Sequence, residues 1–344
     1  MAPDIVLVGS HPPPHGGQAV HIVNLARHLE TQGLRPFFVN TGSDKTQQGD
    51  RLVSVGSSRA LARQLLRMPA PRLIHLHSSS PTDLAKLAPV ALAGAWRGIP
   101  WMLTVHSGNS RDRIRATPGW KRALARTLLR RAARVIGVSE GVSAALREFV
   151  GPQTVRMIPP HSASDGGGEP PADIAAFLAR HTPAIVCIGV FEPIYGFNDA
   201  VRLLASVREA QPNAALILVG NPANSEECRA LIRELGLEGR VMIAGNRSHA
   251  DCQATLKRAA VLLRPTLFDG DSLSVREALA LGVPVVATAT EFRPEGVRLY
   301  HREVAGEAEA ALLAAFASGG SAAAPTAGQE NLAAVQRIYD EVWT

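Results

Sequence analysis

Short β-rich runs alternate with segments of helical spacing along almost the whole chain, and this alternation constrains the fold more than any other feature. Helical spacing is clear in Ile22, Leu25, Ala26 and Leu29, which follow the first run. Such alternation predicts βαβ units and therefore an α/β fold with parallel sheets. Runs that are apolar throughout, such as 185–188, are expected where helices cover both faces of a sheet. The predicted strands are 4–9, 35–40, 51–55, 72–77, 100–105, 134–138 and 154–158, then 184–189, 215–220, 240–244, 260–263 and 284–287.

The alternation is interrupted between residues 159 and 171, where two proline pairs and three glycines exclude a regular element. A chain of 344 residues is long enough for two domains. We therefore predict an N-terminal domain over 1–160, a hinge linker over 161–172 and a C-terminal domain over 173–328. A last amphipathic helix is predicted over 329–344, because its apolar residues recur with helical spacing.

The cysteines Cys187, Cys228 and Cys252 are odd in number and match no zinc-binding spacing, which indicates free thiols in a reducing compartment. The first strand-like run begins at Asp4, which leaves no room for a signal peptide. No apolar run reaches the roughly 18 residues that a membrane span requires. We therefore expect a soluble, cytoplasmic protein. The net charge of +6 suits an anionic ligand, a nucleic acid or an acidic membrane surface.

Gly16 and Gly17 follow the first predicted strand and open a helix predicted over 18–30. Glycines at such a turn let a ligand approach the backbone, and the N-terminus of a helix favours anions. The loop over 11–15 is longer than the turn of a dinucleotide-binding fold, so the GxGxxG pattern does not apply. A plain tight turn would use the same glycines, so both interpretations stay open.

Two histidines, His77 and His106, stand at the ends of predicted strands. The carboxyl ends of parallel strands are where open α/β sheets bind ligands. A histidine at that edge can orient a hydroxyl group or stabilise charge. For each of them a purely structural, hydrogen-bonded histidine is the alternative. His75 lies in the middle of its strand, and we interpret it as structural.

A helix start follows the predicted strand 260–263, and Ser272 or Ser274 can cap it. The helix is predicted to reach Leu281, since a glycine and a proline follow. The free N–H groups of its first turn would form an anion site.

Two carboxylates flank this helix start. Asp269 lies in the loop before it and Glu277 about one turn inside it, so that both can face a ligand. Ionised carboxylates accept hydrogen bonds from sugar hydroxyls. A capping loop with a surface glutamate is the structural alternative. The segment 269–271 also mimics a metal-binding D-x-D motif. Because the helix N-terminus already serves phosphates, we expect no metal site.

Residues 111–134 carry nine basic side chains and one acidic side chain. Trp120, Leu124 and Leu128 recur four residues apart between 118 and 133, which predicts a basic amphipathic helix. Such a helix suits peripheral contact with the inner face of an anionic membrane, or a lipid-phosphate acceptor. The alternative is that the apolar stripe packs in the core. Nucleic acid is not expected as a partner, because no recognition motif is present and aromatics are few.

Taken together, these motifs resemble family 4 of the GT-B glycosyltransferases, a large retaining family with two Rossmann-like domains. The resemblance extends over nearly the whole chain, and the ordered set of blocks is more specific than any one of them. The matching blocks are Gly16 and Gly17 with His21, Leu25 and Ala26, then 73–78, 104–107, 134–140, 215–220, the E-x7-E element 269–277 with its continuation 278–287, and the closing helix around Tyr339.

The resemblance implies roles for the residues of the second domain, which would bind the nucleotide sugar. Glu277 would bind the ribose hydroxyls of the nucleotide. Asp269 would hold hydroxyls of the transferred sugar. Ser272, Leu273 and Ser274 would offer backbone N–H groups to the diphosphate and the sugar.

For the first domain, the resemblance implies the acceptor side of the reaction. Gly16 and Gly17 would lie against the phosphates, and His106 would lie beside the anomeric centre. The C-terminal helix 329–344 would cross back onto this domain.

The sequence departs from the family at the diphosphate site. The family usually has an arginine and a lysine after the first strand of the second domain, whereas Val190 and Tyr195 stand in those positions. Two lost cations must be replaced if a diphosphate is to bind. Arg264 is our candidate for the replacement, and Arg247 and Arg276 are weaker ones.

Two smaller departures are Asp269 in place of a glutamate, and the pair Pro160 and His161 where the family has asparagine and glycine at the hinge. The resemblance implies a retaining hexosyltransferase that needs no cofactor or metal and uses a nucleotide-diphosphate-sugar to extend a glycan, a glycolipid or a small molecule, as in polysaccharide biosynthesis. The alternatives are a non-catalytic GT-B partner subunit, which Val190 and Tyr195 would favour, and a nucleotide-sugar epimerase of the same fold.

Overall fold

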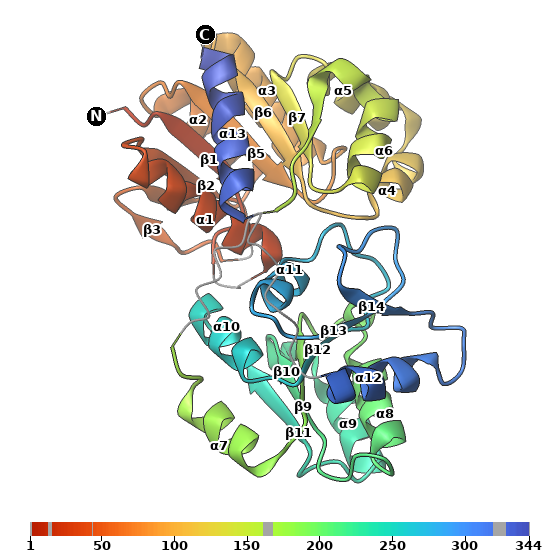
Figure 1. The fold of residues 1–344 in the computed structure, drawn as a ribbon. Coiled ribbons are helices and arrows are strands. Elements are labelled where there is room, and N and C mark those ends of the chain that lie inside the picture. The colour runs from red at the N-terminus through yellow and green to blue at the C-terminus, as the bar shows by residue number, and fades with distance from the viewer. Residues whose placement is uncertain (1, 13–15, 43, 161–167, 319–327, 344) are drawn as a thin grey trace. The chain divides into compact units, whose positions relative to one another are not determined.

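The computed structural model describes residues 2–12, 16–42, 44–160, 168–318 and 328–343 (Figure 1). The chain divides into two compact units, each with its own sheet. The first unit comprises Met1–His161, Asp269–Asp271 and Ala327–Thr344, and the second comprises Ser162–Phe268 and Ser272–Thr326. Most of the predicted hinge, residues 161–167, lies outside the described residues, and a helix already begins at Ala172.

The sheet of the first unit has eight strands, and all its neighbours are parallel except the first two in spatial order. The spatial order is β3 (Gln48–Gly49), β4 (Leu52–Ser54), β2 (Pro36–Asn40), β1 (Ile5–Gly9), β5 (Leu73–Ser78), β6 (Trp101–Val105), β7 (Arg134–Gly137) and β8 (Val155–Met157).

Helices cover both faces of this sheet, so its central strands are buried on both sides (Figure 1). Ile5 and Leu7 of β1 pack with α1 (Gly17–Thr31) and the C-terminal α13 (Gly328–Trp343). Val6 and Val8 point to the other face, because side chains alternate along a strand. That face packs against α2 (Ser58–Arg67), α3 (Leu84–Arg97), α5 (Gly119–Leu129) and α6 (Glu140–Val150), with the short α4 (Ser110–Ala116) beside them.

The second unit has a six-stranded, wholly parallel sheet. Its spatial order is β11 (Val241–Gly245), β10 (Ala215–Val219), β9 (Ala184–Ile188), β12 (Val261–Arg264), β13 (Val285–Thr288) and β14 (Val297–Tyr300). One face packs against α8 (Phe197–Val207), α9 (Glu226–Glu234) and α12 (Glu307–Ser318). The other packs against α7 (Ala172–Arg180), α10 (His249–Lys257) and α11 (Leu273–Ala280).

The predicted fold class is confirmed, and every strand predicted from the sequence is present with small shifts of its ends. Two strands, β3 and β14, were not predicted. Short 3-10 helices occupy Pro152–Thr154, Pro193–Tyr195 and Pro222–Asn224. The three cysteines are free and buried, as expected. Within the described residues no helix has both the length and the apolar character needed to cross a membrane.

Candidate active site

In each sheet the strand order reverses at one place, between β1 and β5 in the first unit and between β9 and β12 in the second. The loops beyond the carboxyl ends of these strands diverge, and open α/β sheets bind ligands in the crevice that results. We call this place the switch point of the sheet, and each unit has one. The positions of the residues predicted from the sequence are described below relative to these two switch points.

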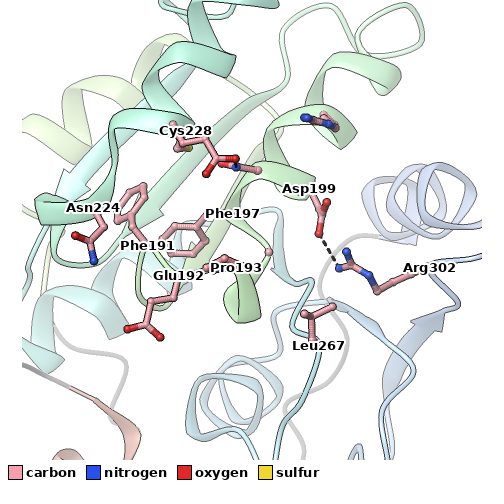
Figure 2. Close-up of a pocket in the computed structure, with 13 residues that line it drawn as sticks. Phe191, Glu192, Pro193, Phe197, Asp199, Asn224, Cys228, Leu267 and Arg302 are labelled. Carbon is pink, nitrogen blue, oxygen red and sulfur yellow. Dashed lines mark hydrogen bonds and ion pairs between the residues drawn. The ribbon is translucent and has the colours of Figure 1, made fainter.

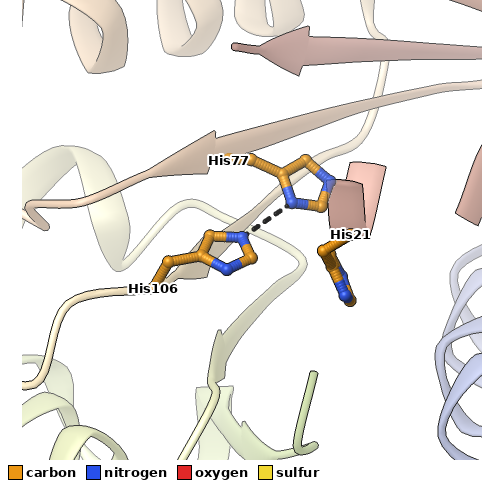
Figure 3. Close-up of side chains that lie close together, drawn as sticks. All are labelled: His21, His77 and His106. Atoms are coloured by element: carbon orange, nitrogen blue, oxygen red, sulfur yellow. Dashed lines mark hydrogen bonds between the residues drawn. The ribbon is translucent and has the colours of Figure 1, made fainter. Parts of the chain in front are cut away.

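Three histidines gather near the switch point of the first unit (Figure 3). His77 lies in β5, His106 directly follows β6, and His21 lies in α1. Nδ1 of His77 is hydrogen-bonded to Nε2 of His106 at 3.1 Å. His77 is fully buried, His21 is nearly so, and His106 is half-buried. His106 was predicted from the sequence to contact the sugar, but its neighbour His21 was not. The two residues are 85 positions apart in the chain, and only the fold brings them together.

The two bonded histidines are neutral. Burial lowers the pKa of His77 and of His106 well below the usual range, and the neighbouring imidazoles lower it further. A neutral ring has one N–H donor and one acceptor nitrogen, so it can bind a sugar hydroxyl without adding charge. Within the described structure, Nε2 of His77 is buried and has no hydrogen-bond partner.

His75 links β5 to the C-terminal helix. Its Nδ1 is 2.6 Å from the hydroxyl oxygen of Tyr339, and its Nε2 is 2.8 Å from Oγ1 of Thr104. All three residues are buried, and burial lowers the pKa of His75 to about 3. Its interpretation as a structural residue is confirmed.

The glycine loop lies next to these histidines in the chain's first unit. Gly16 is the N-terminal capping residue of α1 and, as a glycine, has no side chain that could cap the backbone N–H groups of the first turn. Nε2 of Gln18 donates a hydrogen bond to the backbone carbonyl of His77 at 3.0 Å, which ties the helix start to β5. The predicted phosphate contact of Gly16 and Gly17 stays a prediction.

In the second unit, Glu277 is a buried carboxylate and not a surface residue. Only 3% of Glu277 is exposed, and it lies in α11. Nε2 of His249, the first residue of α10, is 2.5 Å from its carboxylate, and Gln253 donates a longer hydrogen bond of 3.5 Å. The capping-loop alternative is therefore wrong for Glu277. His249 and Gln253 were missed because only the packing of α10 on α11 brings them to it.

Arg264 lies at the switch point between β9 and β12. Its Nη1 donates a hydrogen bond of 2.7 Å to the backbone carbonyl of Ile188 at the end of β9. Its guanidinium group lies over the ring of Tyr195, 5.4 Å from the ring centroid. A side chain at Gly189 would collide with the same ring, since an added Cβ would be 2.5 Å from it. The residue that replaces the family's lysine thus supports an arginine from the neighbouring strand.

A second arginine, Arg293, joins this edge of the sheet and was not predicted. Its Nη2 donates a hydrogen bond of 2.9 Å to Oγ1 of Thr266, and its Nε donates one of 3.1 Å to the carbonyl of Thr288. The sequence does contain a signal for Arg293, because this residue lies in the loop that follows the predicted strand 284–287. Arg247 forms an ion pair with Asp173 and is thereby engaged within its own part of the fold.

The helix α11 begins without a hydrogen bond from its capping side chain. Ser272 is the capping residue, yet its hydroxyl is hydrogen-bonded to that of Ser274 at 3.1 Å and caps no backbone group. Asp269 belongs to the first unit and Glu277 to the second. The prediction that these two carboxylates face one ligand therefore stays a prediction.

A cavity of about 340 Å³ also opens in the second unit, beside the start of α8 (Figure 2). Its lining includes the acidic side chains of Glu192 and Glu227 and an ion pair of 2.7 Å between Asp199 and Arg302. Opposite charges are mixed in this lining, whereas a diphosphate requires an excess of cations. The cavity therefore does not suit the phosphates of a nucleotide.

The basic segment 111–134 is not one helix, because a break at a proline separates α4 from α5. Ala125 and Leu129 of α5 are buried in the core. Trp120 and Leu124 are 67% and 42% exposed. Leu128, the third residue of this stripe, is partly buried and packs against the core. The alternative in which the stripe packs in the core therefore holds for Leu128 but not for Trp120 and Leu124.

Two family models match consecutive parts of this chain. "Glycosyltransferase Family 4" matches residues 15–161, and "Glycosyl transferases group 1" matches residues 174–315. The chain belongs to the group 1 glycosyltransferases. As a member of this family it is a GT-B transferase that uses a nucleotide sugar, and neither the epimerase nor the non-catalytic subunit is favoured.

Relatives of this group 1 glycosyltransferase act on different acceptors. A GDP-mannose-dependent alpha-(1-6)-phosphatidylinositol monomannoside mannosyltransferase of Mycobacterium tuberculosis is 26% identical over 267 residues, which are 73% of this chain and 68% of that protein. A 2-deoxystreptamine glucosyltransferase of Streptomyces kanamyceticus is 25% identical over 237 residues, 64% of this chain and 60% of that protein. The solved structure of a sucrose-phosphate synthase of Thermosynechococcus elongatus has a TM-score of 0.71 at 20% identity and covers 98% of this chain and 96% of its own, which shows the fold.

Proposed function

We propose that this enzyme transfers a sugar with retention of anomeric configuration, and that the second unit binds the nucleoside diphosphate of the donor at the switch point between β9 and β12. The observation that carries this proposal is the position of Arg264. Its guanidinium group is fixed by the carbonyl of Ile188 and by the ring of Tyr195 at the end of β9. A guanidinium group binds phosphate oxygens through charge-assisted hydrogen bonds, so Arg264 replaces the family's missing cations.

The remaining groups of the second unit support the same ligand. The backbone N–H groups at the start of α11, from Leu273 and Ser274, suit phosphate oxygens. The buried carboxylate of Glu277 would accept hydrogen bonds from the ribose hydroxyls, and His249 holds it in place. The departing diphosphate would thus be stabilised by fixed dipoles and by arginine.

In the first unit, His106 would contact the transferred sugar as a neutral imidazole, and Gly16 and Gly17 would contact the phosphates. Asp269 would bind hydroxyls of that sugar. No metal ion is required for this transfer.

Calorimetric titration with UDP, GDP, ADP and TDP, with and without Mg²⁺, tests the donor site. We expect one nucleotide to bind, equally well without Mg²⁺. Glu277→Ala and Arg264→Ala should both weaken it, while Arg258→Ala should not, because Arg258 pairs with Glu169 on an exposed surface of the same unit. If the folded chain binds no nucleotide, the donor site has been lost, and a role as a partner subunit follows.

We also propose that residues 111–134 make peripheral contact with an anionic membrane that presents a lipid-linked acceptor. The support is an exposed apolar surface beside many basic side chains. Trp120 and Leu124 of α5 are exposed, and Leu92 and Trp96 of the adjoining α3 are 65% and 85% exposed. Exposed tryptophan and leucine beside arginine suit the interface of an acidic bilayer.

Cosedimentation with lipid vesicles tests this contact. The chain should bind vesicles that contain phosphatidylglycerol more strongly than vesicles of phosphatidylcholine alone. The double variant Trp120→Ser with Leu124→Ser should lose most of this binding. Leu299→Ser, which removes an exposed leucine of β14 in the second unit, serves as the control. Equal binding by the double variant and the control would favour a small, soluble acceptor.

A further inference from the structure

The three histidines of the first unit form a cluster that the transfer reaction does not explain in full. Only His106 has a proposed contact with the sugar. His21 and His77 are buried polar side chains from α1 and β5, 4% and 0% exposed, and neither has a proposed role in the transfer.

We propose that His21, His77 and His106 together bind one transition-metal ion of the Zn²⁺ class, and that this ion inhibits transfer. One nitrogen of each ring lies within 4.8 Å of the other two (Figure 3). The nitrogens of His77 and His106 that now share a hydrogen are 3.1 Å apart. Two nitrogens bound to one tetrahedral Zn²⁺ at its usual bond lengths are about 3.3 Å apart. His77 and His106 therefore lie at about the spacing of two ligands, although their rings must turn so that both nitrogens face the ion and not each other. His21, whose ligand nitrogen lies within 4.8 Å of theirs, supplies the third ligand when it moves closer.

The type of ligand selects the type of ion. Imidazole nitrogen binds Zn²⁺, Co²⁺, Ni²⁺ and Cu²⁺ well, whereas Mg²⁺ and Ca²⁺ require oxygen ligands. The cluster contains no carboxylate. Three histidines leave a fourth position to water, and because His106 is only half-buried that position can be reached from solvent.

Binding of the ion would break the hydrogen bond between His77 and His106 and would occupy the lone pair of His106. The inhibitory effect rests on the proposed contact of His106 with the sugar, whereas the binding of the metal does not. Mg²⁺ should neither bind here nor compete, so this site is compatible with transfer that needs no metal.

The binding test uses the full chain after treatment with a chelator. Zn²⁺ is titrated by calorimetry, and Co²⁺ by its visible absorption, whose intensity is high only when the ion is tetrahedral. We expect one equivalent of metal to bind to the wild type, and this binding to be lost in His21→Gln and in His77→Gln. His28→Gln is the matched control, because His28 lies on the same helix as His21 and is not part of the cluster.

Absence of a tetrahedral Co²⁺ spectrum in the wild type would overturn the site even if the buried His77→Gln variant failed to fold. Metal binding that persists in folded His21→Gln would overturn it as well. Sugar transfer is then measured at increasing Zn²⁺. Inhibition at the concentrations that fill the site, reversed by EDTA and unaffected by Mg²⁺, is expected. Metal binding without inhibition would leave the metal site intact and would instead contradict the role of His106 in transfer.

Discussion

At the switch point of the first unit the ionisable side chains are imidazoles, whereas at that of the second unit they are guanidinium groups and a carboxylate that is held by one imidazole, His249. Both sheets are parallel, both are covered by helices on two faces, and both reverse their strand order once. The backbone therefore offers the same kind of crevice twice. The chemistry differs because His77 and His106 end two strands of one sheet, while Arg264 ends a strand of the other.

This difference predicts how each unit responds to its surroundings. Neutral, buried imidazoles respond to pH, because they must gain a proton that the fold excludes. Arginines respond to ionic strength, because they stay charged throughout the accessible pH range and their attraction for phosphate is screened by salt. The first unit should therefore be sensitive to acid, and donor binding by the second unit should be sensitive to salt.

The largest effect that we expect is a loss of stability of the first unit in mild acid. Burial lowers the pKa of His75 to about 3 and that of His77 well below its usual range. The unfolded chain takes up protons at these residues as the pH falls through about 6.5, whereas the folded unit does not. Stability is thus fully present above pH 6.5 and falls below it, by about 1.4 kcal/mol per pH unit for each histidine.

Denaturant unfolding between pH 7.5 and 4.5, with a chelator present, measures this loss. All four tryptophans, at positions 96, 101, 120 and 343, belong to the first unit, so their fluorescence reports its unfolding. His75→Gln should reduce the dependence on pH. The same slope in wild type and His75→Gln would contradict the assignment.

A smaller effect is expected on nucleotide binding at the donor site. It tests whether Arg264 replaces the two cations that the family usually has there. Arg264→Ala should weaken nucleotide binding about tenfold to a hundredfold, the range for a lost charge-assisted hydrogen bond. Adding Val190→Arg to this variant should recover part of the loss, because it returns a cation to the end of β9. Calorimetry at low and high salt measures both variants. If Val190→Arg recovers none of the nucleotide binding, a cation at the end of β9 cannot take over the role of Arg264.

The sequence was sufficient to predict the strands that become the core, because a parallel strand buried on both faces has to be apolar along its length, as Ile185–Ile188 is. It was insufficient for β14, in which Arg298 and Leu299 are exposed. A half-exposed edge strand has a weak pattern, and only its pairing with β13 identifies it. The two-residue β3 has no pattern at all.

The candidate site shows the same limit. Positions that end a strand could be predicted, and His77, His106 and Arg264 are all found there. Partners that come from another element could not, because their contact depends on tertiary packing, as with Tyr195 under Arg264. The periodicity predicted correctly that α5 is a helix, but it did not show which face of the helix is buried. Trp120 and Leu124 of the predicted stripe are exposed, and only Leu128 packs against the core. The fully buried residues of this helix are Ala125 and Leu129.

The smallest effect, and the most local, is expected for the hydroxyl group of Tyr339. This group forms a buried hydrogen bond of 2.6 Å with Nδ1 of His75, and so connects α13 to the strand that carries His77. Tyr339→Phe would leave Nδ1 of His75 buried without its partner, at a cost of about 1–3 kcal/mol in the free energy of unfolding. Tyr300→Phe is the matched control, since Tyr300 is also buried and its hydroxyl has no hydrogen bond among the described residues. Denaturant unfolding followed by circular dichroism, which reports both units, should show a loss of stability for Tyr339→Phe alone. If the two variants unfold alike, the hydrogen bond between Tyr339 and His75 does not stabilise the first unit. In that case α13 is held in place by its apolar contacts with α1.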